Sequence, residues 1–157
     1  MTEAELIDSE WSQTFAHNMS FANKVHNNFR EVETLDTLDH EWCYGPPGTG
    51  KSKYAYSHKG AYIKSLNKWW DGYKGEDIVI IDDFGPNQEC LVELLKHWTD
   101  RYPFRAEIKG GSIVIRPKKI IVTSNYHPRE LFKSVDSDAI LRRCKLSHFS
   151  DTLNTIP

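Results

Sequence analysis

The residues best suited to chemistry lie between positions 45 and 52, where types and spacing match a complete phosphate-binding loop. The loop consists of Gly45, Pro46, Pro47, Gly48, Thr49, Gly50, Lys51 and Ser52. Its glycines allow a tight turn in which successive backbone N–H groups point at phosphate oxygens. Lys51 is expected to reach the β- and γ-phosphates, and the Ser52 hydroxyl to bind Mg²⁺. The motif therefore predicts a site for a nucleoside triphosphate with Mg²⁺; the alternative is a fortuitous Gly/Pro loop.

Two acidic residues follow a strongly apolar segment further along the chain. Asp82 and Asp83 come directly after residues 78–81, four consecutive β-branched residues that are typical of a buried parallel strand. A triphosphatase needs an acid that holds the metal and a group that orients the attacking water. We expect Asp82 to bind Mg²⁺ through water and Asp83 to act as the water-activating base. The alternative is a pair of solvated carboxylates at a strand end.

An amide follows the next apolar strand, residues 120–123, at Asn125. In parallel sheets, ligands bind outside the carboxyl ends of the strands. The phosphate loop, Asp83 and Asn125 are all expected at such ends, so they should converge on one crevice. Asn125 can hold the lytic water or the γ-phosphate there, or it can simply be a turn residue before Tyr126.

Two further groups carry positive charge. Arg142 and Arg143 follow Asn125 by 17 and 18 residues, and either could reach a neighbouring subunit's nucleotide or only stabilise a helix C-terminus. Lys109 and Gly110 form the expected tip of a hairpin, which suits contact with a nucleic-acid backbone but also fits a generic turn.

The aromatic residues Trp69, Trp70 and Tyr73 can either stack on bases or anchor the core, and the core is the commoner role. Strands alternate with helices along the chain, which predicts an α/β fold with a parallel sheet flanked by helices. The expected strands are 42–44, 61–64, 78–81, 120–123 and 145–149, with a hairpin of 104–108 and 112–115. The expected helices are 51–58, one from Pro86 to Tyr102-Pro103, and one from a cap at Asp136 or Ser137 to Arg143.

The N-terminal part has a different pattern. Apolar residues recur on one helical face, at Trp11, Phe15, Met19, Ala22, Val25, Phe29 and Val32. Residues 33–41 are polar and predict a linker, so we expect a helical segment and linker over 1–40 and the nucleotide-binding domain over 41–157. The helical face can pack onto that domain or form a subunit contact.

Composition narrows the possible classes of protein. The chain has 157 residues, 39% hydrophobic and 27% charged, without an apolar run long enough to span a membrane or a signal-peptide pattern. Cys43, Cys90 and Cys144 lack metal-type spacing and favour a reducing compartment. Residues 1–44 carry nine acidic and two basic side chains, whereas the rest carries thirteen and eighteen, which permits a polyanionic partner.

These motifs, in this order, resemble the helicase domain of replication-associated (Rep) proteins of circular single-stranded DNA viruses, circovirus-like ones especially. The matching segments are GPPGTGKSKYA, NKWWDGY, VIIDDF, RYPFRAEIKGG, IIVTSN and the Arg pair, over about residues 42–149. The resemblance implies a superfamily 3 helicase with an AAA+-like P-loop core, which uses ATP and Mg²⁺, forms a hexameric ring and unwinds DNA with 3′-to-5′ polarity.

The resemblance also implies residue roles and partners. Lys51 and Ser52 would be Walker A residues, the Asp pair Walker B, and Asn125 the motif C sensor. Lys109 would contact DNA from the B′ hairpin, one of the two arginines would be the finger, and residues 11–32 would mediate oligomerisation. Single-stranded DNA and further copies of the chain are the expected partners, with full-length Rep as another candidate. The family expectation for location is the host nucleus.

The resemblance has one large departure. Full-length relatives begin with a nicking endonuclease that uses a His-hydrophobe-His metal site, and none of His17, His26 and His40 has that spacing. Nicking activity is therefore not expected in this chain. A classical AAA+ ATPase with a helical lid, a P-loop nucleotide kinase, an RNA-directed superfamily 3 ATPase, and a nuclease-free ring-forming regulator of Rep are the alternatives.

Overall fold

The computed structural model describes residues 32–150. The helical face predicted from Trp11 to Val32 lies outside this range except for its last residue, so the oligomerisation segment stays a prediction. Within the described range, no helix is both long enough and apolar enough to cross a membrane.

The centre of the structure is a five-stranded sheet in the order β2-β3-β6-β1-β7. The strands are β1 (His40–Tyr44), β2 (Tyr62–Ile63), β3 (Ile78–Ile81), β6 (Lys119–Ser124) and β7 (Cys144–His148). All neighbouring strands are parallel. This topology confirms the predicted α/β class, and it is consistent with a P-loop, AAA+-like core. Strand β6 separates β1, which leads into the phosphate loop, from β3, which leads into the acid pair.

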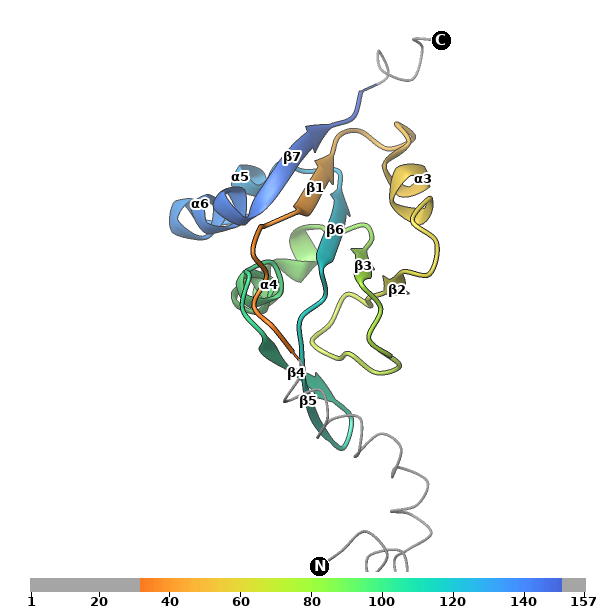
Figure 1. Ribbon diagram of the computed structural model, residues 1–157. Coiled ribbons are helices and arrows are strands. Elements are labelled where there is room, and N and C mark those ends of the chain that lie inside the picture. Colours follow the sequence, from red (N-terminus) through yellow and green to blue (C-terminus); the bar gives the residue numbers. More distant parts are fainter. Residues whose placement is uncertain (1–31, 151–157) are drawn as a thin grey trace, which may run out of the picture. The chain divides into compact units, whose positions relative to one another are not determined.

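Different helices cover the two faces of the sheet (Figure 1). Helix α3 (Lys51–Tyr56) lies on one side, and α4 (Val92–Trp98), α5 (Pro128–Leu131) and α6 (Ser134–Arg143) lie on the other. Because side chains alternate along a strand, Cys43, Ile80 and Ile121 share the face that packs with Ala55 of α3. On the opposite face, Trp42 makes edge-to-face ring contacts with Phe84 and Phe132.

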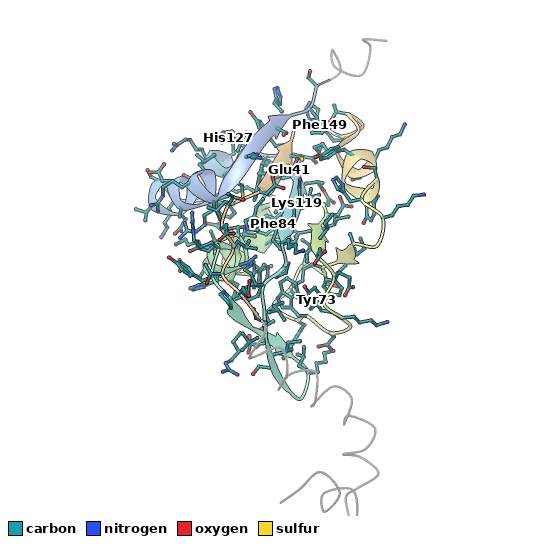
Figure 2. The ribbon with its side chains drawn as sticks, viewed as in Figure 1. Glu41, Tyr73, Phe84, Lys119, His127 and Phe149 are labelled. Atoms are coloured by element: carbon teal, nitrogen blue, oxygen red, sulfur yellow. The ribbon has the colours of Figure 1, made fainter. Side chains whose placement is uncertain are left out.

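A two-stranded antiparallel hairpin, β4 (Phe104–Ile108) and β5 (Gly111–Ile115), lies at the end of the sheet opposite the phosphate loop (Figure 1). Trp70 packs beside it against Phe104 and against Trp98 of α4. Both Trp70 and Tyr73 are buried, which confirms the core role for these two aromatics. Figure 2 shows Tyr73 towards the hairpin end, with His127 and Phe149 towards the opposite end.

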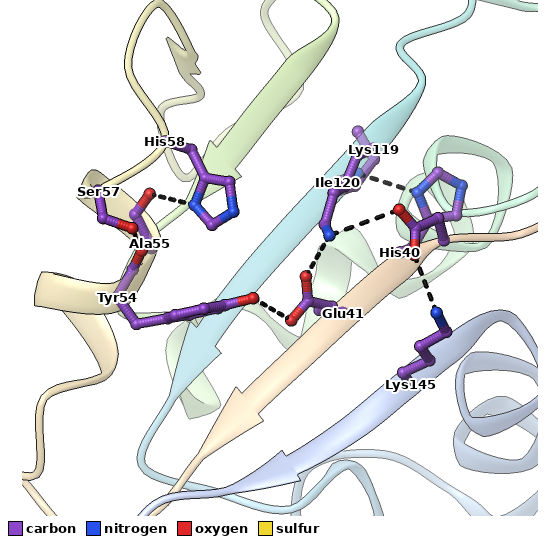
Figure 3. Close-up of polar contacts among 10 residues, drawn as sticks. His40, Glu41, Tyr54, Ala55, Ser57, His58, Lys119, Ile120 and Lys145 are labelled. Atoms are coloured by element: carbon purple, nitrogen blue, oxygen red, sulfur yellow. Dashed lines mark hydrogen bonds and ion pairs between the residues drawn. The ribbon is translucent and has the colours of Figure 1, made fainter.

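Two polar residues that the sequence placed in the linker 33–41 belong instead to β1. The His40 ring accepts a hydrogen bond from the Ile120 amide at 2.9 Å and bonds the Asp100 carbonyl through Nε2 at 3.2 Å. Glu41 accepts a hydrogen bond from the Tyr54 hydroxyl at 2.6 Å and pairs with Lys119, as Figure 3 shows. The linker prediction was wrong for these residues because polar side chains can be buried when they have such partners.

The helix after the phosphate loop is shorter than predicted. Helix α3 ends at Tyr56 rather than His58, because local side-chain bonds take up its last carbonyls. The Ser57 hydroxyl donates to the Tyr54 carbonyl, and the His58 ring bonds the Ala55 carbonyl at 3.0 Å.

The helices on the other face also differ from prediction. The segment from Pro86 begins as a 3₁₀ turn, η1 (Pro86–Leu91), before α4, which ends at Trp98. Helix α6 begins at Ser134, so the predicted caps Asp136 and Ser137 lie inside it. Their side chains bond elsewhere, to Lys96 and to the Ser134 carbonyl. Helix α5 was not predicted, although His127-Pro128 with Glu130 forms a capping box.

Candidate nucleotide-binding site

The phosphate loop joins β1 to α3 at the carboxyl edge of the sheet. Its glycines at 45, 48 and 50 have φ values of 148°, 77° and 93°, a region that favours glycine. Gly45 is also required by packing, because a Cβ there would lie 2.0 Å from the Phe149 carbonyl oxygen. The Phe149 amide donates to the Tyr44 carbonyl at 2.7 Å, so the segment after β7 supports the start of the loop.

Lys51 is buried within the loop although it is charged. Its Nζ donates to the carbonyls of Gly45 and Pro46, each at 2.7 Å. Thr49 donates to the same Pro46 carbonyl at 2.7 Å, which closes the turn. Burial lowers the pKa of Lys51, and the negative charges of Asp83 and Asp82 oppose that shift. The loop carbonyls therefore fix the position of the Lys51 ammonium, which also interacts electrostatically with the two carboxylates.

The register of the sheet brings Asp82 beside Thr123. Ile81 of β3 pairs with Val122 of β6, so the next residues lie side by side on the face that α3 covers. One carboxylate oxygen of Asp82 accepts hydrogen bonds from the Thr123 hydroxyl at 2.5 Å and the Ser52 hydroxyl at 2.9 Å. The structure thus brings together the two residues that the sequence predicted as metal ligands, Ser52 and Asp82.

Asp83 adopts a strained backbone conformation beside this cluster. Its φ of 61° is the single positive value among the non-glycine residues of the described range. Such a conformation costs about 1–3 kcal/mol and is often found at functional sites. The Asp83 amide donates to the Thr123 hydroxyl at 2.9 Å, and the Phe84 amide donates to the Thr123 carbonyl at 2.8 Å. One threonine therefore contacts both acids.

These groups open onto a pocket of about 430 Å³. Its lining comes from the phosphate loop, the acid pair and the end of β6: Pro47, Gly48, Gly50, Lys51, Ser52, Lys53, Asp82, Asp83, Thr123 and Asn125. Asn125 is exposed in this pocket, after the end of strand β6. The phosphate loop, the acid pair and Asn125 thus converge on one crevice.

The donor set of this pocket fits Mg²⁺ together with a triphosphate. Mg²⁺ in such sites takes one or two carboxylates, and substrate phosphates and water complete its coordination. Ser52 and Asp82 supply a hydroxyl and a carboxylate with oxygens 2.9 Å apart. Residues 32–150 contain no cluster of three or more His, Cys, Asp or Glu side chains that could hold a metal ion.

Sequence reasoning missed two residues of the site. Thr123 appeared only as the last residue of an apolar strand, and its role depends on the register between β3 and β6. Tyr56 is about half exposed at the end of α3, and the pKa of its hydroxyl is raised by burial and by the Asp82 carboxylate. The spacing from Ser52 to Tyr56, one helical turn, is the signal that could have found it.

The structure separates the two arginines that the sequence could not distinguish. Arg143 donates to the Ala139 carbonyl at 2.9 Å and pairs with Asp100 at 3.3 Å, so it links α6 to the end of α4. Arg142 is exposed and lines a surface hollow with Arg129 and Val135, and it has no ion pair within residues 32–150. Neither arginine lines the pocket of its own chain.

Lys109 and Gly110 occupy the tip of the hairpin, as predicted. Both residues are exposed, and Gly110 has a φ of 94°. The tip lies at the end of the sheet remote from the phosphate loop (Figure 1), so Lys109 belongs to a second surface and not to the nucleotide pocket.

A family model described as RNA helicase matches residues 41–126. The chain belongs to this helicase family. The matched helicase range contains the phosphate loop, the acid pair, the hairpin and Asn125, whereas the Arg pair lies beyond it.

Curated viral proteins are similar to this helicase chain. The replication-associated protein of Beak and feather disease virus is 44% identical over 131 residues, which cover 81% of this chain and 42% of that protein. The corresponding protein of Goose circovirus is 44% identical over 105 residues, 63% of this chain and 34% of that protein. That of Human associated cyclovirus 1 is 40% identical over 115 residues, 67% of this chain and 40% of that protein.

The chain spans less than half the length of these relatives. The matches confirm the resemblance to the helicase domain of circovirus-like replication-associated proteins.

Proposed function

We propose that this helicase domain hydrolyses ATP and uses the energy to move along single-stranded DNA with 3′-to-5′ polarity, as part of a viral replication initiator. The observation that carries the proposal is the cluster of Ser52, Asp82 and Thr123 opposite Lys51 in one pocket. A pocket with a buried ammonium, a hydroxyl–carboxylate pair and a second free carboxylate suits phosphoryl transfer to water. The similarity to viral replication-associated proteins supports DNA as the nucleic acid along which the domain moves.

Each side chain has a defined task in this proposal. Lys51 and the loop amides bind the phosphates, and Ser52 and Asp82 hold Mg²⁺. When bound, Mg²⁺ neutralises charge on the phosphate oxygens. Asp83 accepts the proton of the attacking water, and Asn125 orients that water. Asp83 suits the role of base because its carboxylate is exposed to the pocket, whereas Asp82 is bonded to two hydroxyls.

A ring of subunits completes the site in the same proposal. Arg142 is exposed and unpaired in the described part of the chain, so it is available to a neighbouring copy. An arginine supplied from outside the pocket stabilises charge that develops during transfer, which is worth about 10³–10⁵ in rate where it operates. A hexamer is the arrangement that the family resemblance implies, and the predicted helical segment before residue 33 would support it.

An RNA-directed ATPase is the second candidate, because the matching family is described as RNA helicase. The two candidates share the pocket and differ in the nucleic acid that Lys109 contacts. We therefore propose to measure ATP hydrolysis by the whole chain with no nucleic acid, with single-stranded DNA, and with RNA of the same sequence. DNA is expected to stimulate turnover more than RNA does; stronger stimulation by RNA would favour the second candidate.

The hairpin variant Lys109→Ala tests whether DNA binding at the hairpin tip stimulates ATP hydrolysis in the nucleotide pocket. It should keep the basal rate but lose DNA binding and DNA stimulation, because Lys109 lies outside the nucleotide pocket. Lys118→Ala is the matched control, since Lys118 is also an exposed lysine and lies 3.7 Å from the surface carboxylate of Asp77. Equal DNA affinity of Lys109→Ala and the wild type would remove the hairpin from the proposal.

A further inference from the structure

A loop of residues 67–73, which is rich in aromatic residues, contacts β4 and the tip of the hairpin. The Lys109 backbone amide, at the turn itself, donates a 2.9 Å hydrogen bond to a carboxylate oxygen of Asp71. The Trp70 amide donates to the Glu107 carbonyl at 2.8 Å, and Lys68 lies 3.6 Å from the Glu107 carboxylate. The loop therefore runs alongside β4 and reaches the tip through Asp71.

The loop is in turn attached to the central sheet. The Tyr62 hydroxyl of β2 donates to the backbone carbonyl of Asp71 at 2.7 Å, and the Tyr62 ring stacks on Trp70. Strand β2 pairs with β3, the strand that ends at the acid pair. A short series of contacts thus leads from β3 through Tyr62 and Asp71 to the amide of Lys109.

This support matters because the hairpin does not belong to the central sheet. Strands β4 and β5 form a two-stranded sheet of their own, and a two-stranded hairpin by itself is marginally stable in water. The loop adds a bridge to this sheet, between Trp69 and Glu107. Gly110 has no side chain to restrict the turn, and its φ is 94°. The position of the Lys109 side chain relative to the sheet therefore depends on what holds its backbone.

We propose that Asp71 is a positioning residue that fixes the hairpin tip, and with it Lys109, relative to the sheet that carries the nucleotide pocket. Its carboxylate acts on the Lys109 backbone, not on nucleic acid or nucleotide. The inference rests on the proposed function of the hairpin, since a fixed tip affects activity only if the tip contacts nucleic acid. Movement of the sheet during hydrolysis would then move Lys109, and with it the single-stranded DNA that Lys109 contacts.

Charge and hydrogen bonding at Asp71 can be separated by two substitutions. Asp71→Asn removes the negative charge beside Lys109 but keeps an acceptor oxygen, whereas Asp71→Ala removes both. Both variants lose the repulsion between the Asp71 carboxylate and nucleic-acid phosphates. A difference in DNA stimulation between the two variants therefore measures the effect of the hydrogen bond. Asp77→Ala is the matched control, because Asp77 is an exposed aspartate whose carboxylate lies 3.7 Å from the Lys118 ammonium, away from the hairpin tip.

The functional test measures ATP hydrolysis by the full chain with and without single-stranded DNA. Asp71→Ala should lower the DNA-stimulated rate about two- to tenfold at an unchanged basal rate, the effect of one lost hydrogen bond. Asp71→Asn and Asp77→Ala should retain stimulation within about twofold by the same reasoning. Equal stimulation of Asp71→Ala and Asp71→Asn would overturn the inference.

A second measurement does not depend on activity. Amide hydrogen exchange, followed by mass spectrometry on peptides that cover 104–115, should be faster in Asp71→Ala than in Asp71→Asn by about two- to tenfold. If the wild type shows no ATPase, the proposed function fails, and exchange alone decides whether Asp71 holds the tip. If DNA stimulates the wild type but exchange is the same in both variants, only the role of Asp71 fails.

Discussion

The hydroxyl of Thr123 offers a sharp test of the site because it serves both acids at once. It donates to the Asp82 carboxylate at 2.5 Å and accepts from the Asp83 amide at 2.9 Å. Thr123→Val keeps the β-branched shape within β6 and removes both bonds. We expect ATP turnover by this variant to fall, because Asp82 loses a donor that orients it and Asp83 loses the bond that holds its left-handed backbone.

The size of the effect follows from the two bonds. A hydrogen bond to a charged group is worth about 1.5–3 kcal/mol, and a neutral one about 0.5–1.5 kcal/mol. A loss of about 2–4 kcal/mol at the transition state corresponds to a fall in kcat of about 30- to 1,000-fold. Because Asp82 is the expected metal carboxylate, half-maximal activity should also require more Mg²⁺.

The assay is steady-state ATP hydrolysis with Mg²⁺ titrated at saturating ATP. Thr123→Ser should recover most of the wild-type rate, since it restores the hydroxyl. Thr99→Val is the control for general destabilisation, because Thr99 is also buried and its hydroxyl donates to the Leu95 carbonyl. A Thr123→Val enzyme with kcat and Mg²⁺ dependence within twofold of the wild type would refute the reasoning.

Three further predictions concern the loop, the core and the subunit contact. Gly45→Ala should abolish ATP binding in a calorimetric titration and lower the melting temperature, since its Cβ would overlap a backbone carbonyl. Burial, with the charge of Arg116 next, lowers the His40 pKa to about 4 from 6.5, so the native state binds fewer protons than the unfolded state between these values. Stability should therefore fall by about 3 kcal/mol from pH 6.5 to 4 in urea unfolding, and His40→Gln should lose that dependence. Arg142→Ala subunits mixed with Lys51→Ala subunits should regain ATPase activity, whereas Arg143→Ala should mainly lower stability; no rescue by Arg142→Ala would exclude it as the finger.

Much of the fold could be predicted because the buried strands have simple patterns. Residues 78–81 match β3 as observed, and 120–123 lie within β6, since runs of β-branched apolar residues have few other environments. A hairpin was equally clear from Lys109, Gly110 and the flanking apolar segments, although Gly111, which the sequence placed in the turn, is the first residue of β5. These elements depend on local sequence, so local sequence was enough to find them.

The errors arose where tertiary partners decide the outcome. His40 and Glu41 look like linker residues until β6 and α3 supply their hydrogen-bond partners. Asp136 and Ser137 are good helix caps in isolation, but Lys96 and the Ser134 carbonyl engage their side chains inside α6. No local pattern reveals the partners of His40, Glu41 and Asp136, because they lie on other elements. The Ser137 bond is local, one turn back along α6.

In the candidate site, too, residues with a local sequence signal could be predicted, and residues placed by tertiary contacts could not. The residues that must bind phosphate and metal stand in a contiguous motif or directly after a strand. Their convergence could be predicted because ligands bind outside the carboxyl ends of parallel strands. Thr123 could not be found, because its position beside Asp82 depends on the register of two strands that are remote in sequence. Likewise, only the structure shows that Arg143 is engaged by Asp100 while Arg142 is exposed.

The central claim is that Lys51 and the acid pair form a working ATPase. Its most direct test is phosphate release from ATP by the purified chain and by Lys51→Ala, with the exposed Lys59→Ala as the matched control. We predict Mg²⁺-dependent turnover by the wild type and Lys59→Ala and none by Lys51→Ala. Turnover by Lys51→Ala at the wild-type rate would contradict the assignment of the pocket.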